Sequence, residues 1–161
     1  MAIAQDGGCR LIAVELEEGG AALARSFIDV ERLTAIRDLI AENSFRPTGC
    51  RGRQLTLKLT VRDNRLVLDI ADAKAAPHVR HILSLSPLTR VLREYRQICD
   101  SYHAAVGAMS TRELEAIDMG RRGLHNEGAE TLRDRLKGKV EMDFQTARRL
   151  FTLICALRWR M

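Results

Sequence analysis

The chain has few aromatic residues and no long hydrophobic run, and each absence excludes a class of protein. Only 4% of its 161 residues are aromatic, which is too few for a surface on which nucleic-acid bases stack. No apolar run approaches the roughly 18 residues that a membrane-spanning helix needs. The N-terminus lacks both the basic and the sustained apolar regions of a secretory signal. We therefore expect a cytoplasmic protein without a membrane segment.

Recognisable motifs for metals, cofactors and covalent catalysis are also missing. The cysteines at positions 9, 50, 99 and 155 are scattered and never show Cys-x-x-Cys spacing. His78 and His81 have no carboxylate or cysteine at ligand spacing nearby. The chain contains no Gly-x-Ser-x-Gly elbow, no Walker loop and no Gly-x-Gly-x-x-Gly fingerprint. We expect no disulfide framework, no metal site and no cofactor.

Basic and acidic residues nearly balance and are interspersed along the chain. There are 26 Lys and Arg residues against 21 Asp and Glu residues, which gives a net charge of +5. Because no block of positive charge could follow a phosphate backbone, RNA or DNA binding through dispersed arginines is an alternative rather than the preferred interpretation. The 46% apolar and 29% charged residues are typical of a globular protein. The length predicts a single domain over residues 1–161, with a flexible N-terminus over residues 1–9.

The best-defined local structure is a β-hairpin over residues 54–71. Leucines alternate with polar residues on both sides of Asp63-Asn64, a pair that tolerates the positive φ of a type I′ turn. A two-residue turn fixes the register, and it places Lys58 opposite Asp69. Similar alternation predicts strands over residues 12–17 and 78–85, and 3.6-residue periodicity predicts several helices. The expected fold is α+β, with a small antiparallel sheet around the hairpin and helices packed on one face.

The main candidate for function is a polar segment over residues 117–128 that contains three glycines. Its polar residues are Asp118, Arg121, Arg122, His125, Asn126 and Glu127. We predict a loop between two helices, because so few apolar side chains cannot build a core element. One interpretation is purely structural, with Gly123 ending the first helix and Asn126 capping the second.

Several functions are open for this segment if its side chains point outward. We prefer a non-enzymatic regulatory or protein-interaction module that contacts a protein partner through residues 117–128, because the catalytic set is incomplete. Arg121 and Arg122 could also hold a phosphate-containing or carboxylate ligand. In an enzyme, His125 would act as the general base and Glu127 would orient it. The terminal helix that ends at Trp159 could serve a homodimer.

Four segments resemble a bacterial group, the uncharacterised protein family 0262. They are Leu39–Phe45 (LIAENSF), His81–Pro87 (HILSLSP), Glu115–Gly128 (EAIDMGRRGLHNEG) and Ala147–Leu153 (ARRLFTL). The resemblance covers nearly the whole chain, and the third segment is specific to the group. It implies a small cytoplasmic bacterial protein, and it brings no activity and no functional residues with it.

Overall fold

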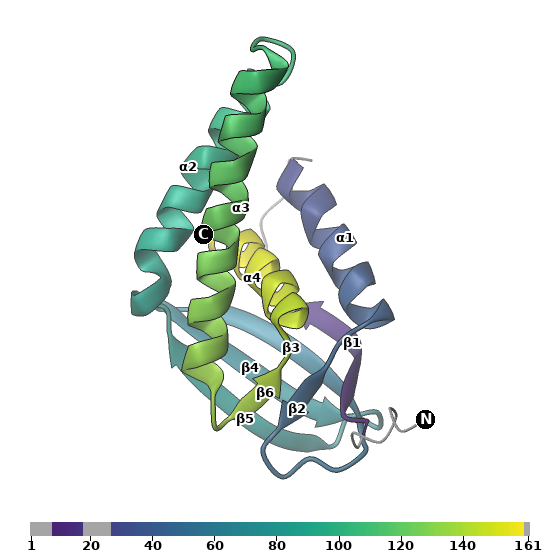
Figure 1. Cartoon of the computed structure of the whole chain (residues 1–161). Coiled ribbons are helices and arrows are strands. Elements are labelled where there is room, and N and C mark those ends of the chain that lie inside the picture. Colours follow the sequence, from purple (N-terminus) through teal and green to yellow (C-terminus); the bar gives the residue numbers. More distant parts are fainter. Residues whose placement is uncertain (1–7, 18–26, 160–161) are drawn as a thin grey trace.

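The chain folds into a four-stranded sheet with helices on one of its faces, which confirms the α+β class (Figure 1). The computed structural model describes residues 8–17 and 27–159. Within these residues the strands are β1 (Arg10–Leu16), β2 (Phe45–Pro47), β3 (Gln54–Arg62), β4 (Arg65–Asp72), β5 (Pro77–Ser84) and β6 (Val140–Met142). The helices are α1 (Phe27–Ala41), α2 (Thr89–Ala105), α3 (Thr111–Leu136) and α4 (Phe144–Trp159), with a short 3-10 turn, Ser86–Leu88, before α2.

The central hairpin of β3 and β4 has the predicted register. Lys58 lies opposite Asp69, and the leucines of both strands meet on the face that the helices cover. Asp63 and Asn64 have φ angles of 51° and 58°, as a type I′ turn requires. Strand β5 pairs antiparallel with β4, so the strand predicted over residues 78–85 is also confirmed.

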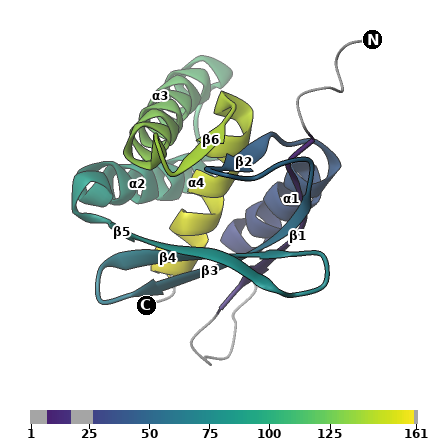
Figure 2. The ribbon, with the colours of Figure 1, turned by 90° about the horizontal axis from the view of Figure 1, so that it is seen from below.

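The sheet is mixed rather than wholly antiparallel, because β1 pairs parallel with β3 at one end of the order β1-β3-β4-β5. Helix α1 carries the chain back between these two strands, as a parallel connection demands. Strands β2 and β6 form a separate two-stranded antiparallel sheet, which was not predicted from the sequence. Figure 2 shows the main sheet as one layer, with helices α1 to α4 all packed on the same side of it.

A disulfide joins Cys9 and Cys50, so the expectation of no disulfide is wrong. The two cysteines are 41 positions apart, and their Cα atoms lie 6.6 Å apart. Parallel pairing of Arg10 with Gln54 brings the start of β1 beside the segment that precedes β3. Rules based on cysteine spacing identify only local motifs. They cannot identify two cysteines that are brought together by the pairing of distant strands. Of the predicted flexible N-terminus, residues 1–7 lie outside the described residues.

Residues 117–128 lie within α3, a single helix of 26 residues, so the predicted loop is wrong. Ser110 caps this helix, because its side-chain oxygen accepts a hydrogen bond from the backbone N–H of Glu113 at 3.2 Å. Two of the glycines allow close contact with neighbouring helices. A Cβ atom on Gly120 would come within 2.8 Å of a methyl group of Ile98, and one on Gly128 within 2.3 Å of the Phe151 ring.

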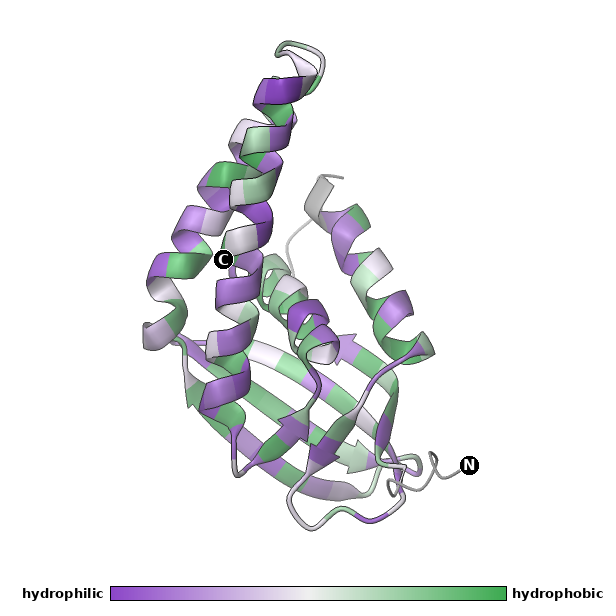
Figure 3. Ribbon diagram, viewed as in Figure 1, coloured by the Kyte–Doolittle hydropathy of each residue, from purple (hydrophilic) through white to green (hydrophobic). Residues whose placement is uncertain are grey.

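Helix α4 runs through the middle of the helical layer and contacts α1, α3 and β3. Figure 3 shows that most of its residues are hydrophobic, whereas α3 is largely hydrophilic. Its buried positions run from Thr146 to Leu157. Among the described residues, no helix combines the length and apolarity that a membrane crossing requires.

Candidate functional site

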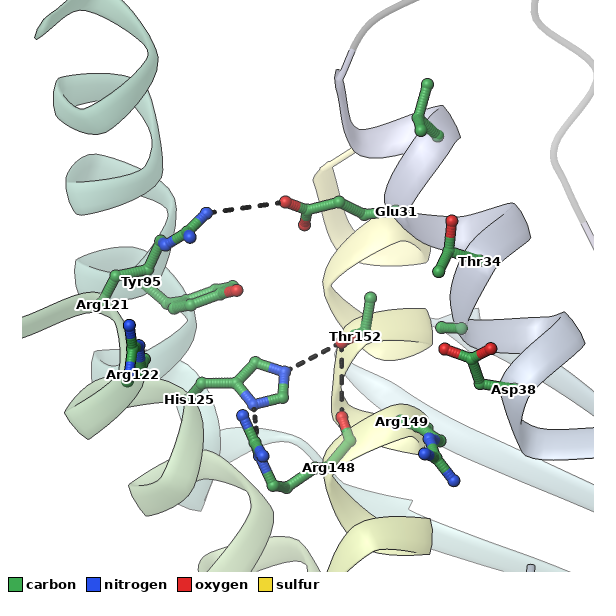
Figure 4. Close-up of a pocket in the computed structure, with 12 residues that line it drawn as sticks. Glu31, Thr34, Asp38, Tyr95, Arg121, Arg122, His125, Arg148, Arg149 and Thr152 are labelled. Carbon is green, nitrogen blue, oxygen red and sulfur yellow. Dashed lines mark hydrogen bonds and ion pairs between the residues drawn. The ribbon is translucent and has the colours of Figure 1, made fainter. Parts of the chain in front are cut away.

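A cleft of about 330 Å³ lies between α1, α3 and α4 and brings together residues from distant parts of the chain (Figure 4). Helix α3 contributes Arg121, Arg122 and His125, and α4 contributes Arg148, Arg149 and Thr152. Arg121 and Arg122 lie four and three positions before His125, and Arg148 and Arg149 have the same spacing from Thr152, so each helix turns one broad face to the cleft. The cleft therefore collects four arginines from two adjacent helices.

The opposite wall of the cleft is one face of α1. It carries Glu31, Thr34 and Asp38, which lie three and four positions apart, and Figure 4 shows Glu31 directed at Arg121. Burial raises the pKa of the Glu31 carboxyl, although the positive charge of Arg121 acts in the opposite direction. The cleft thus has a mainly cationic side and an acidic, hydroxyl-bearing side.

His125 is buried in the floor of the cleft and is 8% exposed. Its Nε2 lies 2.8 Å from the hydroxyl oxygen of Thr152, which itself donates to the backbone carbonyl of Arg148 at 3.3 Å. Since the hydroxyl proton is used there, Nε2 is the donor to Thr152. Nδ1 accepts a 3.3 Å hydrogen bond from Nε of Arg148. Burial, followed by the charges of Arg148 and Arg121, lowers the pKa of His125 to about 4, so the ring is neutral at pH 7.

Arg121 and Arg122 each have a carboxylate partner, whereas Arg148 and Arg149 have none among the described residues. The one side-chain hydrogen bond of Arg148 to them goes from Nε to His125, which leaves both terminal nitrogens without a hydrogen bond to the described part of the chain. The residue is half-buried. Its neighbour Arg149 donates to the backbone carbonyl of Glu42 at 3.1 Å.

Arg121 and Arg122 share one carboxylate, that of Asp118. Nη2 of each guanidinium lies 2.6 Å from an Asp118 oxygen, in the i,i+3 and i,i+4 arrangement expected of a helix. These hydrogen bonds lower the pKa of Asp118. The Arg121 side chain is 22% exposed, lies over the Tyr102 ring at 4.2 Å and reaches within 3.8 Å of Glu31, whereas that of Arg122 is 70% exposed. Only Arg122 points mainly outward.

The predicted acid–base pair of His125 and Glu127 is not formed. Glu127 makes an ion pair with Arg90 of α2, on the side of α3 away from the cleft. Residues two positions apart point in different directions on a helix, so the prediction depended on a loop that does not exist. Asn126 has a buried side-chain oxygen without a hydrogen bond to the described residues, and it does not line the cleft. The described residues also contain no cluster of three or more His, Cys, Asp or Glu that could hold a metal.

Four charged residues that line the cleft were not among the predicted site residues: Glu31, Asp38, Arg148 and Arg149. In the sequence, Glu31 and Asp38 fall on the polar face of an amphipathic helix. This pattern does not show that the polar face lies opposite another helix. Arg148 and Arg149 fall inside residues 147–153, one of the segments that carried the family resemblance. That segment was therefore a signal that could have identified them.

Comparison with known proteins gives one consistent result. Residues 8–160 match the family described as "Uncharacterised protein family (UPF0262)". A UPF0262 protein of Azorhizobium caulinodans is 56% identical over 155 residues, and one of Brucella canis is 53% identical over 154 residues. Each alignment covers 94% of both chains. No solved structure matches the chain. The names of these relatives specify no ligand, substrate or partner.

Proposed function

The chain belongs to the Uncharacterised protein family (UPF0262), and from the geometry of its cleft we propose that it is a non-enzymatic regulatory module that binds an anionic group. The observation that carries this proposal is Arg148. It is half-buried at the cleft, oriented by His125 and unpaired with any described carboxylate. A guanidinium partly withdrawn from water favours an anion as its partner, since an uncompensated buried charge is costly.

The charge and size of the cleft support the same proposal. Four arginines and two carboxylates line it, so the lining residues carry a net positive charge. A guanidinium with two free terminal nitrogens can donate two parallel hydrogen bonds to a carboxylate or a phosphate. The cleft volume of about 330 Å³ lies within the range of small-molecule sites. We therefore place the anionic ligand between Arg148 and Arg121.

The contacts of His125 favour binding over catalysis. A general base needs a free nitrogen lone pair within reach of the substrate. In His125, Nδ1 already accepts from Arg148 and Nε2 donates to Thr152. The carboxylate of Glu127 points elsewhere and is engaged by Arg90. We thus assign His125 as a positioning residue that fixes the direction of the Arg148 guanidinium.

The regulatory part of the proposal follows from the position of the cleft. A ligand there would contact α1 on one side and α3 and α4 on the other, and it would hold these elements together. We expect the module to signal the ligand to a protein partner. Substitution of Arg122 by alanine tests that step in a pulldown, because the Arg122 side chain is 70% exposed. Loss of a captured protein without loss of stability is the expected result.

The test of anion binding uses inorganic phosphate and acetate as probes in isothermal titration calorimetry. We expect at least one of them to bind the wild type, and Arg148→Gln to weaken that binding by about tenfold or more, which corresponds to about 1.4 kcal/mol. The matched control is Arg135→Gln, which removes an equal charge from an exposed position of α3. Equal affinities in the two variants, or no binding of either probe to the wild type, would contradict the proposal.

A further inference from the structure

The two walls of the cleft differ in charge, and this difference restricts the ligand more than positive charge alone. We infer that the ligand is a small zwitterion, with an ammonium group near its carboxylate or phosphate. This inference rests on the proposed anion binding by Arg148. The anionic group would face Arg148 and Arg121, and the ammonium group would face Glu31 and Asp38 across the cleft (Figure 4).

Glu31 is the first observation behind this inference. Its side chain is 29% exposed and faces the arginines from α1. The cation that faces it across the cleft is Arg121, with 3.8 Å between Nη1 and the carboxylate. That guanidinium already donates to Asp118 from Nε and Nη2, at 3.1 and 2.6 Å. His103 also lowers the pKa of Glu31, but burial outweighs the effect of both groups and raises it, so Glu31 is only partly compensated. A ligand ammonium would supply a charge-assisted hydrogen bond that Arg121 does not.

Asp38 is the second observation, and it lies two helical turns along the same face of α1. Its ion-pair partner among the described residues is its neighbour Arg37, at 3.7 Å, and the Arg37 side chain is 77% exposed. An ion pair of this kind contributes little. Thr34 lies between Asp38 and Glu31 and adds a hydroxyl that can accept from a ligand N–H. The α1 wall thus offers hydrogen-bond acceptors at three positions along one helix face.

A plain anion fits this cleft less well than a zwitterion does. A carboxylate or phosphate at Arg148 adds a further negative charge near the carboxylates of Glu31 and Asp38, and like charges in a partly desolvated site repel. An ammonium group on the ligand removes that repulsion and pairs with the acceptors of α1. The cleft volume of about 330 Å³ is near the lower end for ligand sites, which favours a molecule of amino-acid size.

The experiment compares ligands that differ only in the ammonium group. Calorimetric titrations pair acetate with glycine, propionate with β-alanine, and ethyl phosphate with phosphoethanolamine. The first two pairs represent amino acids, and the third represents phosphorylated amino alcohols. We expect one zwitterion to bind the wild type about tenfold or more tightly than its partner anion. Glu31→Gln and Asp38→Asn should each lower this ratio, with Glu31→Gln also raising the affinity for the plain anion. The matched control is Glu115→Gln, an exposed position of α3.

Each outcome bears on one proposal or both. A wild-type preference for a zwitterion that falls in both α1 variants and persists in the control supports the inference. If plain anions bind through Arg148 equally well or better, the zwitterion is wrong but the anion site stands. A zwitterion preference that survives both substitutions contradicts the roles of Glu31 and Asp38. If neither member of any pair binds, both proposals fail. Thermal unfolding of each variant checks that the fold is intact.

Discussion

The continuous course of α3 is best tested by two glycine-to-alanine substitutions that make the same chemical change at different places. Gly128→Ala would place a Cβ atom 2.3 to 2.7 Å from three atoms of the Phe151 ring, which is fully buried. Forcing volume into a packed core costs about 1–3 kcal/mol, and so short a contact belongs at the upper end. Replacing glycine by alanine within a helix returns about 1 kcal/mol. The net expectation is a loss of about 2 kcal/mol in the free energy of unfolding.

Gly123→Ala is the matched variant, because no atom beyond its chain neighbours and the nearby backbone of its own helix lies within 4 Å of the added Cβ atom. It should gain about 1 kcal/mol from helix propensity alone. Urea unfolding followed by far-UV circular dichroism measures both variants, and thermal midpoints should move by about 2–4 °C per kcal/mol. If Gly123→Ala destabilised the protein, residue 123 would have a backbone conformation that alanine resists, as in the helix–helix turn predicted from the sequence. That result, or a neutral Gly128→Ala, would refute the reasoning.

Three further predictions concern stability. Reducing the bond between Cys9 and Cys50, which closes a 41-residue separation, should cost about 4 kcal/mol on the loop-entropy relation, and a urea midpoint unchanged by reductant would contradict this. The pKa of His125 is lowered from 6.5 to about 4, so the unfolded state binds its proton first and stability is lost as the pH falls from about 6.5 to 4. His125 should account for about 3 kcal/mol of the stability lost over this pH range. The total loss over the same range should therefore be smaller by about 3 kcal/mol in His125→Gln. The surface pair of Arg90 and Glu127 should contribute about 1 kcal/mol or less in a double-mutant cycle.

The hairpin could be predicted because its determinants are local. The turn residues Asp63 and Asn64 adopt the positive φ that their types tolerate, and the leucine alternation admits only one register for a buried face. The caps at Ser110 and Asp143 are local as well, because each side-chain oxygen accepts a hydrogen bond from the backbone N–H three residues further on. Local chemistry of this kind is readable from a single sequence.

The course of α3 could not be predicted in the same way. Glycine disfavours a helix by about 1 kcal/mol, and three glycines within twelve residues therefore indicate a break. Tertiary packing overrides that preference, because Gly120 and Gly128 allow α2 and α4 to approach closely. The polar residues between them sit on different faces of the helix, where Asp118 pairs with two arginines and Glu127 pairs with α2.

The cleft was only partly predictable for a related reason. Helical spacing shows that Glu31 and Asp38 share a face, and so do Arg121 and His125. Which faces meet is decided by the packing of α1 and α3 against α4, over sequence separations of more than a hundred residues for some pairs. Arg148 lies in a segment that carried the family resemblance, but its role in the proposal follows from its contacts: a hydrogen bond to His125 and no described carboxylate.

The central claim is that Arg148 captures an anion at the cleft. The most direct measurement follows the arginine Nε–H signals by ¹⁵N NMR during titration with glycine, phosphoethanolamine and inorganic phosphate. The account predicts that the signals of Arg148 and Arg121 shift first and saturate together, with a parallel change at the His125 ring, while exposed Arg135 stays constant. Shifts confined to exposed arginines, or uniform weak shifts that never saturate, would contradict it.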